Sequence, residues 1–334
     1  MCRLNLSLML NFRLKPTSYG RLRDWVLLVC CNLMWASQLT MVKLVQEQMG
    51  PVFATFLPMT LATLLLIPLV GVRQRPPDSR RIINWRDVFD FILIGVFGQV
   101  VAQLFITWGV QLSLASNAAL VLLALPVAIA VMAHFLLGEQ MTPIRWLSFG
   151  LAIAGVLECS GINWRELNFL SKKFFVGNLL IFLSLNGSAF YTVYCKKLLA
   201  KYSPLKVLLY SYYAVFAFLL PITVYTEPGA FRIIFHYTER VWIGLVILTL
   251  FQYFLSMVIF LNVLTRLSAT QVGVSNYLIP FLGLVIAAIV LHEHLTKFMV
   301  VGGILVLMST MLITVFEDAK RHDESTEMVD VDRA

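Results

Sequence analysis

Charged residues are scarce in this sequence: Asp, Glu, Lys and Arg together make up only 13% of its 334 residues. Soluble domains usually carry about 25% charged residues, so this chain cannot build a solvated surface of ordinary extent. Apolar residues make up 59% of the chain, and the mean hydropathy is +0.82. The composition therefore excludes an ordinary soluble protein and predicts a chain that lipid covers over most of its outer surface.

Cysteine is also scarce, and the motifs of metal and catalytic sites are lacking. The five cysteines show no C-x-x-C spacing, and four of them lie in or beside apolar runs, which is typical of small buried residues. The segment His292-Glu293-His294 does not have the H-E-x-x-H spacing of a zinc site. No phosphate loop or nucleophile constellation is present, so we expect no metal, no cofactor and no catalytic residue.

Long apolar runs are what the sequence does contain, and roughly 20 apolar residues suffice for a helix to cross a bilayer. Backbone groups in lipid must bond within their own segment, so these runs predict helices. The ten runs are 25–45, 52–72, 88–109, 115–137, 144–161, 175–195, 205–226, 241–262, 269–291 and 298–316. The sequence therefore predicts an all-α integral membrane protein with ten transmembrane helices.

The distribution of basic residues predicts the orientation of these helices. With the N-terminus in the cytoplasm, the cytoplasmic loops hold 19 Lys and Arg residues and the outer loops hold 6. This bias follows the positive-inside rule and predicts that both termini are cytoplasmic. The net charge of +8 is thereby explained without a nucleic-acid partner. We expect residues 1–24 to form a cytoplasmic segment and residues 317–334 a disordered acidic tail.

The two halves of the sequence match each other at an offset of 154 residues without a gap. The matched pairs of rarer residues are Asn32 with Asn186, Lys43 with Lys197, Arg86 with Arg240, Asn117 with Gln271, Pro126 with Pro280, Glu139 with Glu293, and Thr142 with Thr296. A unit of five helices is odd, so its second copy enters the membrane from the opposite side. We therefore predict two inverted five-helix repeats, over residues 25–161 and 175–316.

Proline and polar side chains predict a central cavity between the two repeats. Pro126 and Pro280 lie about 11 residues into their spans, roughly 17 Å deep, where each is predicted to kink its helix and act as a hinge; a packing kink without substrate contact is the alternative. Polar side chains within spans usually face the bundle or a water-filled cavity, although any single amide could instead form an interhelical hydrogen bond. The candidate substrate-binding residues are Asn32, Trp35, Gln38, Gln99, Gln103, Asn117, Asn186, Tyr191, Gln252, Tyr253, Asn276 and Tyr277.

The chemistry of this predicted cavity restricts its substrate. No carboxylate lies near a predicted midplane, and His134, late in the fourth span, is interpreted as structural. An uncharged cavity rich in amides and aromatic rings suits amino acids or other amphipathic solutes. Strongly anionic phosphates would require Lys or Arg within the spans. Coupling to protons commonly uses a buried carboxylate or histidine, so a facilitator or an exchanger is also compatible with the sequence.

The sequence resembles the EamA-like ten-helix members of the drug/metabolite transporter superfamily. The resemblance rests on the run 32–37 with Lys43, and on the segment from Ala115 through Pro126 to Glu139, which recurs from Ala269 to Glu293. It covers residues 25–316. It implies a ten-helix basket of inverted halves that exports or exchanges metabolites, with spans one, three, four, six, eight and nine around the cavity. Ala36 departs from the pattern, because such families often have glycine there.

We therefore predict a secondary transporter of small organic metabolites that works by alternating access, in the cell (inner or plasma) membrane. The expected partners are a small-molecule substrate and the lipid bilayer, and a homodimer is left open. The alternatives are a membrane channel or scaffold protein and, less favoured, a membrane-embedded enzyme. An enzyme would require clustered His, Asp or Glu at one membrane face, and the sequence shows none.

Overall fold

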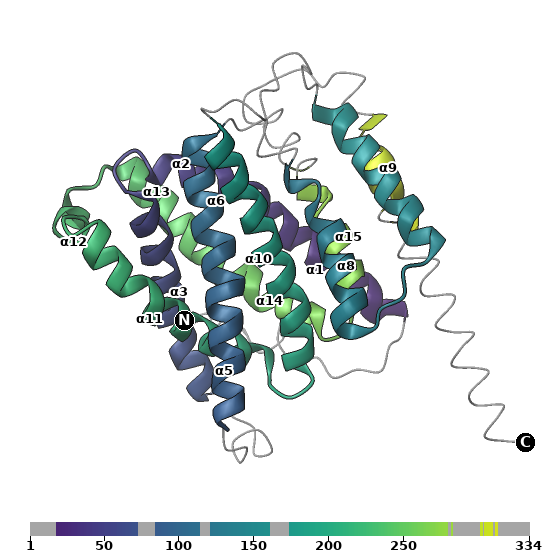
Figure 1. Cartoon of the computed structure of the whole chain (residues 1–334), viewed down its shortest axis with the longest axis horizontal. Helices are drawn as coiled ribbons and strands as arrows, with labels where there is room; N and C mark the ends of the chain where they lie inside the picture. The colour runs from purple at the N-terminus through teal and green to yellow at the C-terminus, as the bar shows by residue number, and fades with distance from the viewer. Residues whose placement is uncertain are drawn as a thin grey trace, which may run out of the picture.

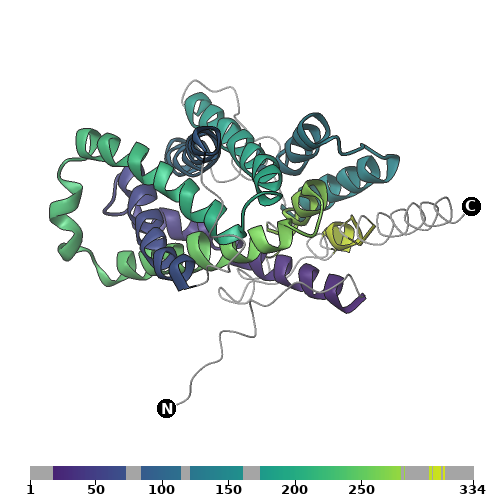
Figure 2. The ribbon, with the colours of Figure 1, turned by 90° about the horizontal axis from the view of Figure 1, so that it is seen from below.

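The computed structural model describes residues 18–72, 84–113, 121–160 and 174–279, with residues 282, 301–302, 304–309 and 311–312 near the C-terminus. All regular structure in these residues is helical (Figure 1). The helices are α1 (Ser18–Ala36), α2 (Gln38–Val45), α3 (Pro51–Val72), α5 (Trp85–Leu93), η1 (Ile94–Val100), α6 (Val101–Leu112), α8 (Leu125–Leu137), α9 (Pro143–Ser160), α10 (Phe175–Leu199), α11 (Pro204–Thr226), α12 (Ala230–Ile233), η2 (Ile234–His236), α13 (Glu239–Ile247), η3 (Leu248–Leu255), α14 (Ser256–Leu264) and α15 (Ala269–Ser275). In Figures 1 and 2, α12 lies at one side of the bundle and α9 at the opposite side.

Six stretches of the described residues are long and apolar enough to cross a membrane. They are Leu22–Val45, Pro51–Val70, Trp85–Leu112, Phe175–Leu199, Pro204–Thr226 and Glu239–Leu264. They agree with the predicted first, second, third, sixth, seventh and eighth spans. Within the fourth span α8 is a shorter apolar helix, and α9 covers the fifth. Most of the predicted ninth and tenth spans, and both terminal segments, lie outside the described residues, so the number of ten helices and the cytoplasmic termini stay predictions.

The order of helical elements repeats at the same spacing of 154 residues as the sequence. The third span consists of α5, η1 and α6, and the eighth consists of α13, η3 and α14. Both η1 and η3 are π-helical, and they begin at Ile94 and Leu248, which are equivalent positions in the two halves. Segments of π-helix are rare and are frequently found at functional sites. Their recurrence at equivalent positions supports a two-repeat architecture.

The fourth and ninth spans are interrupted near the predicted hinge prolines. Residues 123–124 form a turn before α8, and Pro126 lies in the first turn of that helix. Proline is well tolerated there, because the N–H that it lacks would have no partner within the helix. Pro126 therefore starts a new helical segment after this interruption, and its role as a hinge stays a prediction. In the ninth span, α15 ends at Ser275 and a turn follows at 276–277, whereas Pro280 lies outside the described residues.

Glycines on the third span allow it to pack closely against α10. A Cβ atom on Gly109 would lie 2.7 Å from Cγ1 of Ile181 and 2.9 Å from the carbonyl oxygen of Gly177. A Cβ atom on Gly98 would lie 3.0 Å from the Cβ of Tyr191. These spacings are shorter than ordinary van der Waals contacts, so larger residues would separate the two spans. Small residues commonly form such interfaces between membrane helices, and here they set the position of Tyr191.

We expect Gly109→Ala to lower the melting temperature of the detergent-solubilised protein, because overpacking a close interface costs about 1–3 kcal/mol. Gly150→Ala is the matched control, since a Cβ atom there would meet nothing within 4 Å. Thermal unfolding followed by intrinsic tryptophan fluorescence measures both variants. Equal melting temperatures for the two variants would contradict the close approach of α6 to α10.

Candidate functional site

A chain of amide and phenol groups crosses the centre of the bundle. Nε2 of Gln38 on α2 donates to Oε1 of Gln103 on α6 at 2.9 Å. The hydroxyl of Tyr253 on η3 lies 3.4 Å from the same oxygen, and the hydroxyl of Tyr212 on α11 donates to the carbonyl oxygen of Tyr253 at 2.7 Å. The structure thus brings together three of the predicted site residues, Gln38, Gln103 and Tyr253, from three different spans.

A second polar group joins the first span to the eighth and ninth spans. Nδ2 of Asn32 donates to the carbonyl oxygen of Ser275 at 2.8 Å. Nε1 of Trp35 donates to Oγ of Ser256 at 3.0 Å, and that hydroxyl donates to the carbonyl oxygen of Gln252 at 2.5 Å. Asn32 and Trp35 lie three residues apart and so share one face of α1. That face looks toward the interrupted ninth span and the π-helical part of the eighth span.

Three buried polar atoms at this site have no hydrogen-bond partner among the described residues. They are Oδ1 of Asn32, Oε1 of Gln252 and Oδ1 of Asn276. The hydroxyl of Tyr277 also has none, but its side chain packs in a separate cluster with Leu123, Phe149 and Val306. A buried polar atom without a partner costs about 1–3 kcal/mol. The hydrogen-bonding groups of a polar solute, or of water, can satisfy these atoms. The cluster is therefore equipped to receive a polar ligand, mainly by accepting hydrogen bonds.

Tyr191 and Gln99 form a buried pair beside these groups. Their exposed fractions are 4% and 2%, and the buried Tyr191 hydroxyl has no hydrogen-bond partner among the described residues. Gln99 lies in the π-helical segment of the third span. Both residues were predicted site residues, and the structure places them between the third, sixth and seventh spans.

Asn186 does not join the cluster through any hydrogen bond in the described structure. Its Nδ2 donates to the carbonyl oxygen of Phe182 at 2.8 Å, one turn earlier in α10. Phe182 lies on the same face of the helix and is 51% exposed. The two remaining predicted residues, Asn117 and Pro280, lie outside the described residues.

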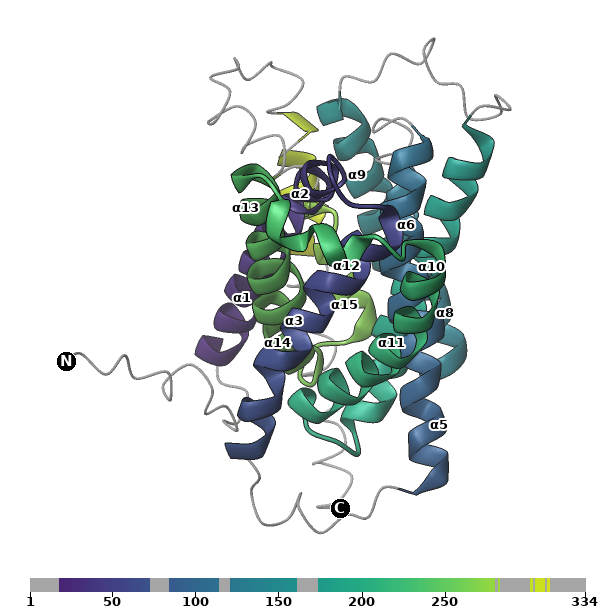
Figure 3. The same ribbon diagram turned by 90° about the vertical axis from the view of Figure 1, so that its left-hand side faces the viewer.

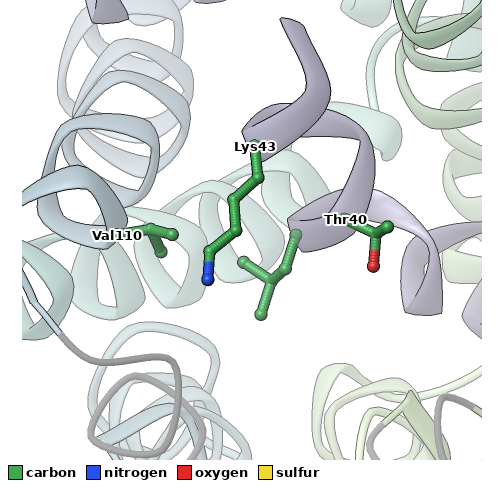
Figure 4. A pocket seen from close by; sticks show the side chains of 4 residues that line it. Thr40, Lys43 and Val110 are labelled. Carbon is green, nitrogen blue, oxygen red and sulfur yellow. The ribbon is translucent and has the colours of Figure 1, made fainter. Parts of the chain in front are cut away.

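A cavity of about 190 Å³ lies between α2 and α6 (Figure 4). Leu39, Thr40 and Lys43 of α2 and Val110 of α6 line it. The side chain of Lys43 extends across the cavity toward Val110. Sequence reasoning placed Lys43 near the outer end of the first helix and did not include it in the site. The sequence feature that could have identified Lys43 as a functional residue is a cation within an apolar run, which is rare in membrane helices.

The opposite end of the bundle is held by charged contacts to the segment 264–270, which connects α14 to α15. Nε of Arg266 lies 2.6 Å from Oδ2 of Asp24 on α1, and Nη2 lies 2.7 Å from Oδ1, so this ion pair is bidentate. Nζ of Lys196 on α10 donates to the carbonyl oxygens of Leu264 and Leu267 at 2.6 and 2.7 Å. These carbonyls end α14, where a positive charge is favourable.

Glu139 binds the same segment at the start of α15. Its carboxylate accepts hydrogen bonds from the backbone N–H groups of Ala269 and Thr270 at 2.8 and 3.2 Å, and from the Thr270 hydroxyl at 2.6 Å. Nη1 of Arg145 lies 3.5 Å from this carboxylate. A carboxylate at a helix N-terminus satisfies free N–H groups and the helix dipole. Glu139 of the first repeat therefore caps α15, which belongs to the second repeat.

These tethers and the cavity lie at opposite ends of the first span. Asp24 and Lys43 are 19 residues apart, which corresponds to roughly 28 Å along a helix. Figure 3 shows α2 toward the upper end of the bundle and the start of α5 at its lower end. The backbone N–H of Thr238 donates to Oε1 of Gln48 at 2.9 Å, so the loop before α13 lies at the end where α2 finishes.

The fold and the site define a polytopic helical membrane protein with two repeats around a polar centre. The sequence profile of the EamA-like transporter family matches residues 24–160 and 175–315. The chain belongs to this family, as the resemblance in the sequence predicted. The family supports a transporter embedded in lipid and does not by itself specify the substrate.

Individual relatives are distant but match over most of their length. An uncharacterized transporter of Archaeoglobus fulgidus is 23% identical over 297 residues, which cover 87% of this chain and 99% of that protein. A probable terminal-alkyne amino-acid exporter of Streptantibioticus cattleyicolor is 26% identical over 302 residues, covering 90% and 96%. A crystal structure with 17% sequence identity aligns with a TM-score of 0.72 over 88% of this chain and 97% of that chain. It supports the fold alone.

We expect Gln103→Leu to weaken solute binding about tenfold or more, since Gln103 links the first and eighth spans and loss of a buried hydrogen-bond partner costs about 1–3 kcal/mol. Asn186→Leu makes the same polar-to-apolar change at a residue that bonds within its own helix, and we expect near-normal binding. Ligand-induced shifts in melting temperature measure both variants, because a ligand that binds only the native state stabilises it. A larger loss in Asn186→Leu than in Gln103→Leu would contradict this assignment of the site.

Proposed function

We propose that this protein is a secondary transporter that moves small organic solutes, such as amino acids or similar amphipathic metabolites, by alternating access. The observation that carries the proposal is the difference between the two ends of the bundle. Charged contacts from three other spans hold one end closed around the segment 264–270. The other end contains the cavity lined by Leu39, Thr40, Lys43 and Val110.

Among the described residues, the ion pair of Asp24 with Arg266 and the Lys196 contacts lie at one end. At the other end the Glu227 carboxylate accepts hydrogen bonds from the backbone N–H groups of Val52 and Phe53 at 3.0 Å. An offset of 154 residues relates Asp24 to Asn178, Arg266 to Leu112 and Lys196 to Val42. Asp24, Arg266 and Lys196 are therefore replaced by neutral or apolar residues at the equivalent places in the other repeat, whereas Glu139 corresponds to another carboxylate, Glu293. At the place equivalent to Asp24, Asn178 accepts a hydrogen bond from the Ser113 hydroxyl. Two halves of similar packing with unequal end contacts favour one conformation while keeping the other accessible.

The positive-inside rule assigns these ends to the two sides of the membrane. It places the N-terminus, and hence Asp24 and the segment 264–270, on the cytoplasmic side. The conformation described is then closed to the cytoplasm, with the cavity on the outer side. In a transport cycle the tethers break when the halves rock, and the polar centre becomes accessible from the cytoplasm.

The central cluster favours an amphipathic solute of modest size. Its amides and tyrosines supply hydrogen bonds, and Trp35, with its ring centroid 5.2 Å from that of Phe260, supplies an apolar surface. A relative named as a probable amino-acid exporter is consistent with this chemistry. Contacts that close one end of a two-repeat bundle are expected of an alternating-access carrier, and electrical recording distinguishes it from a channel. A membrane-embedded enzyme finds no support in the names of the relatives, which describe transporters.

Purified protein in liposomes is expected to exchange labelled amino acids for unlabelled ones in counterflow. The standard L-amino acids and L-propargylglycine form the panel, and empty liposomes are the control. Saturable uptake that requires solute on both sides supports a carrier, because each turnover then returns a loaded site. Electrical conduction faster than any carrier cycle would instead establish a channel, and inertness toward the whole panel would argue against the proposed substrate class.

Breaking the ion pair of Asp24 and Arg266 should open the cytoplasmic end. In a cysteine-free background, we expect Ala269→Cys to react slowly with a maleimide applied from the cytoplasmic side, because Ala269 is fully buried. Adding Asp24→Arg or Arg266→Asp should raise the rate about tenfold, because removing one partner of a largely buried pair costs at least 1–2 kcal/mol.

The double variant that combines Asp24→Arg with Arg266→Asp restores opposite charges and is expected to return the labelling rate toward its original value. Lys201→Gln, which alters a cation at an exposed turn on the same side, is the control for nonspecific effects of charge. If both single variants label as slowly as the parent, the ion pair does not hold this end closed.

A further inference from the structure

Lys43 is a charged side chain that reaches into the cavity between α2 and α6. Within the described part of the chain, no ion pair joins Lys43 to a carboxylate. The other lining groups are the apolar side chains of Leu39 and Val110 and the hydroxyl of Thr40. Lys43 is exposed, so a solute in the cavity can reach its amino group.

The neighbours of Lys43 place this cavity at the interface of α2 and α6. Leu39 packs against Ile106 and Val110 of α6 and Ile181 of α10, which forms the wall between these helices. Gln38, which bonds to Gln103, precedes Lys43 by five residues, or roughly 7.5 Å along the helix. The cavity therefore lies between one and two helical turns from the hydrogen bond of Gln38 with Gln103.

An orienting role does not account for a lysine at this position. The positive-inside rule concentrates basic residues on the cytoplasmic side, whereas Lys43 lies toward the opposite end of the first span. The exposed ammonium group of Lys43 can attract an anion that enters the cavity. Because the cavity volume of about 190 Å³ is below the roughly 300–1,000 Å³ of pockets that hold drug-sized ligands, the anion is a small one.

We propose that Lys43 binds the carboxylate of the transported solute, with the Thr40 hydroxyl as a second donor, and so selects carboxylate-bearing amphipathic solutes over their neutral analogues. This inference rests on the proposed transport function and names its substrate class. The ammonium group contributes charge complementarity at the outer entrance. The amides and aromatic rings beyond it hold the remainder of the solute.

The test compares L-amino acids with their carboxamides, for example L-leucine with L-leucinamide, on the full-length protein. Binding is measured as the shift in melting temperature, and transport as counterflow in liposomes. In Lys43→Gln we expect the KM and the binding constant for each carboxylate solute to rise at least tenfold, with no loss for the carboxamides. Lys43→Arg keeps the charge and should retain most of the carboxylate preference.

Arg232→Gln is the matched control, because it removes an exposed cation from the loop between the seventh and eighth spans, at the same end of the bundle. It should leave both solute classes unaffected, and the melting temperature of unliganded Lys43→Gln should stay close to that of the parent. A Lys43→Gln variant that handles carboxylates like the parent overturns the inference even if transport is confirmed.

The outcomes for this residue and for the proposed function can be separated. Carboxylate binding that depends on Lys43, without any flux, supports the anion site and contradicts the transport function. Flux that is equal for acids and amides supports the function and contradicts the anion site. If neither binding nor flux is detected for any solute of the panel, both the anion site and the transport function are contradicted.

Discussion

The need to pair every backbone N–H and C=O group within the membrane is the constraint that organises this structure. Regular helices meet it without help, and irregular backbone is tolerated only where protein or a watery cavity surrounds it. The departures from regular helix lie at Ser37, at 123–124, at 276–277 and in the two π-helical segments. All of them occur within predicted spans.

The candidate site residues cluster at these irregularities. Gln38 follows the break after α1, and Asn276 and Tyr277 form the turn after α15. Gln99, Gln252 and Tyr253 lie within the π-helical segments. Polar side chains and freed backbone groups thus occupy the same region of the bundle. Groups that would be costly against lipid become usable for a solute when they are gathered in one interior site.

The spans and the repeat could be predicted from the sequence because they depend on local composition and on spacing. Six of the ten apolar runs correspond to helices that can cross a membrane, and the offset of 154 residues recurs in the π-helical segments. The roles of Glu139 and Lys43 could not be predicted, because each depends on contacts between segments that are distant in sequence or on a cavity between two helices. The same limit applies to Asn186, since a polar residue within a span does not reveal which face of its helix meets the interior.

The first span connects all the parts of the proposed cycle. It carries Asp24 in the tethered end, Asn32 and Trp35 at the polar centre, and Lys43 at the cavity, with a break at Ser37 between the last two groups. A solute can shift a conformational equilibrium only by as much as its affinity differs between the two states. In the proposed cycle, a solute that engages both sides of the break would change the relative position of α1 and α2, and Asp24 would move with α1. Through the break at Ser37, solute binding can be coupled to the ion pair of Asp24 and Arg266 at the opposite end of the first span. To open that end, the solute must bind the open state more tightly than the closed state by at least the free energy of this ion pair.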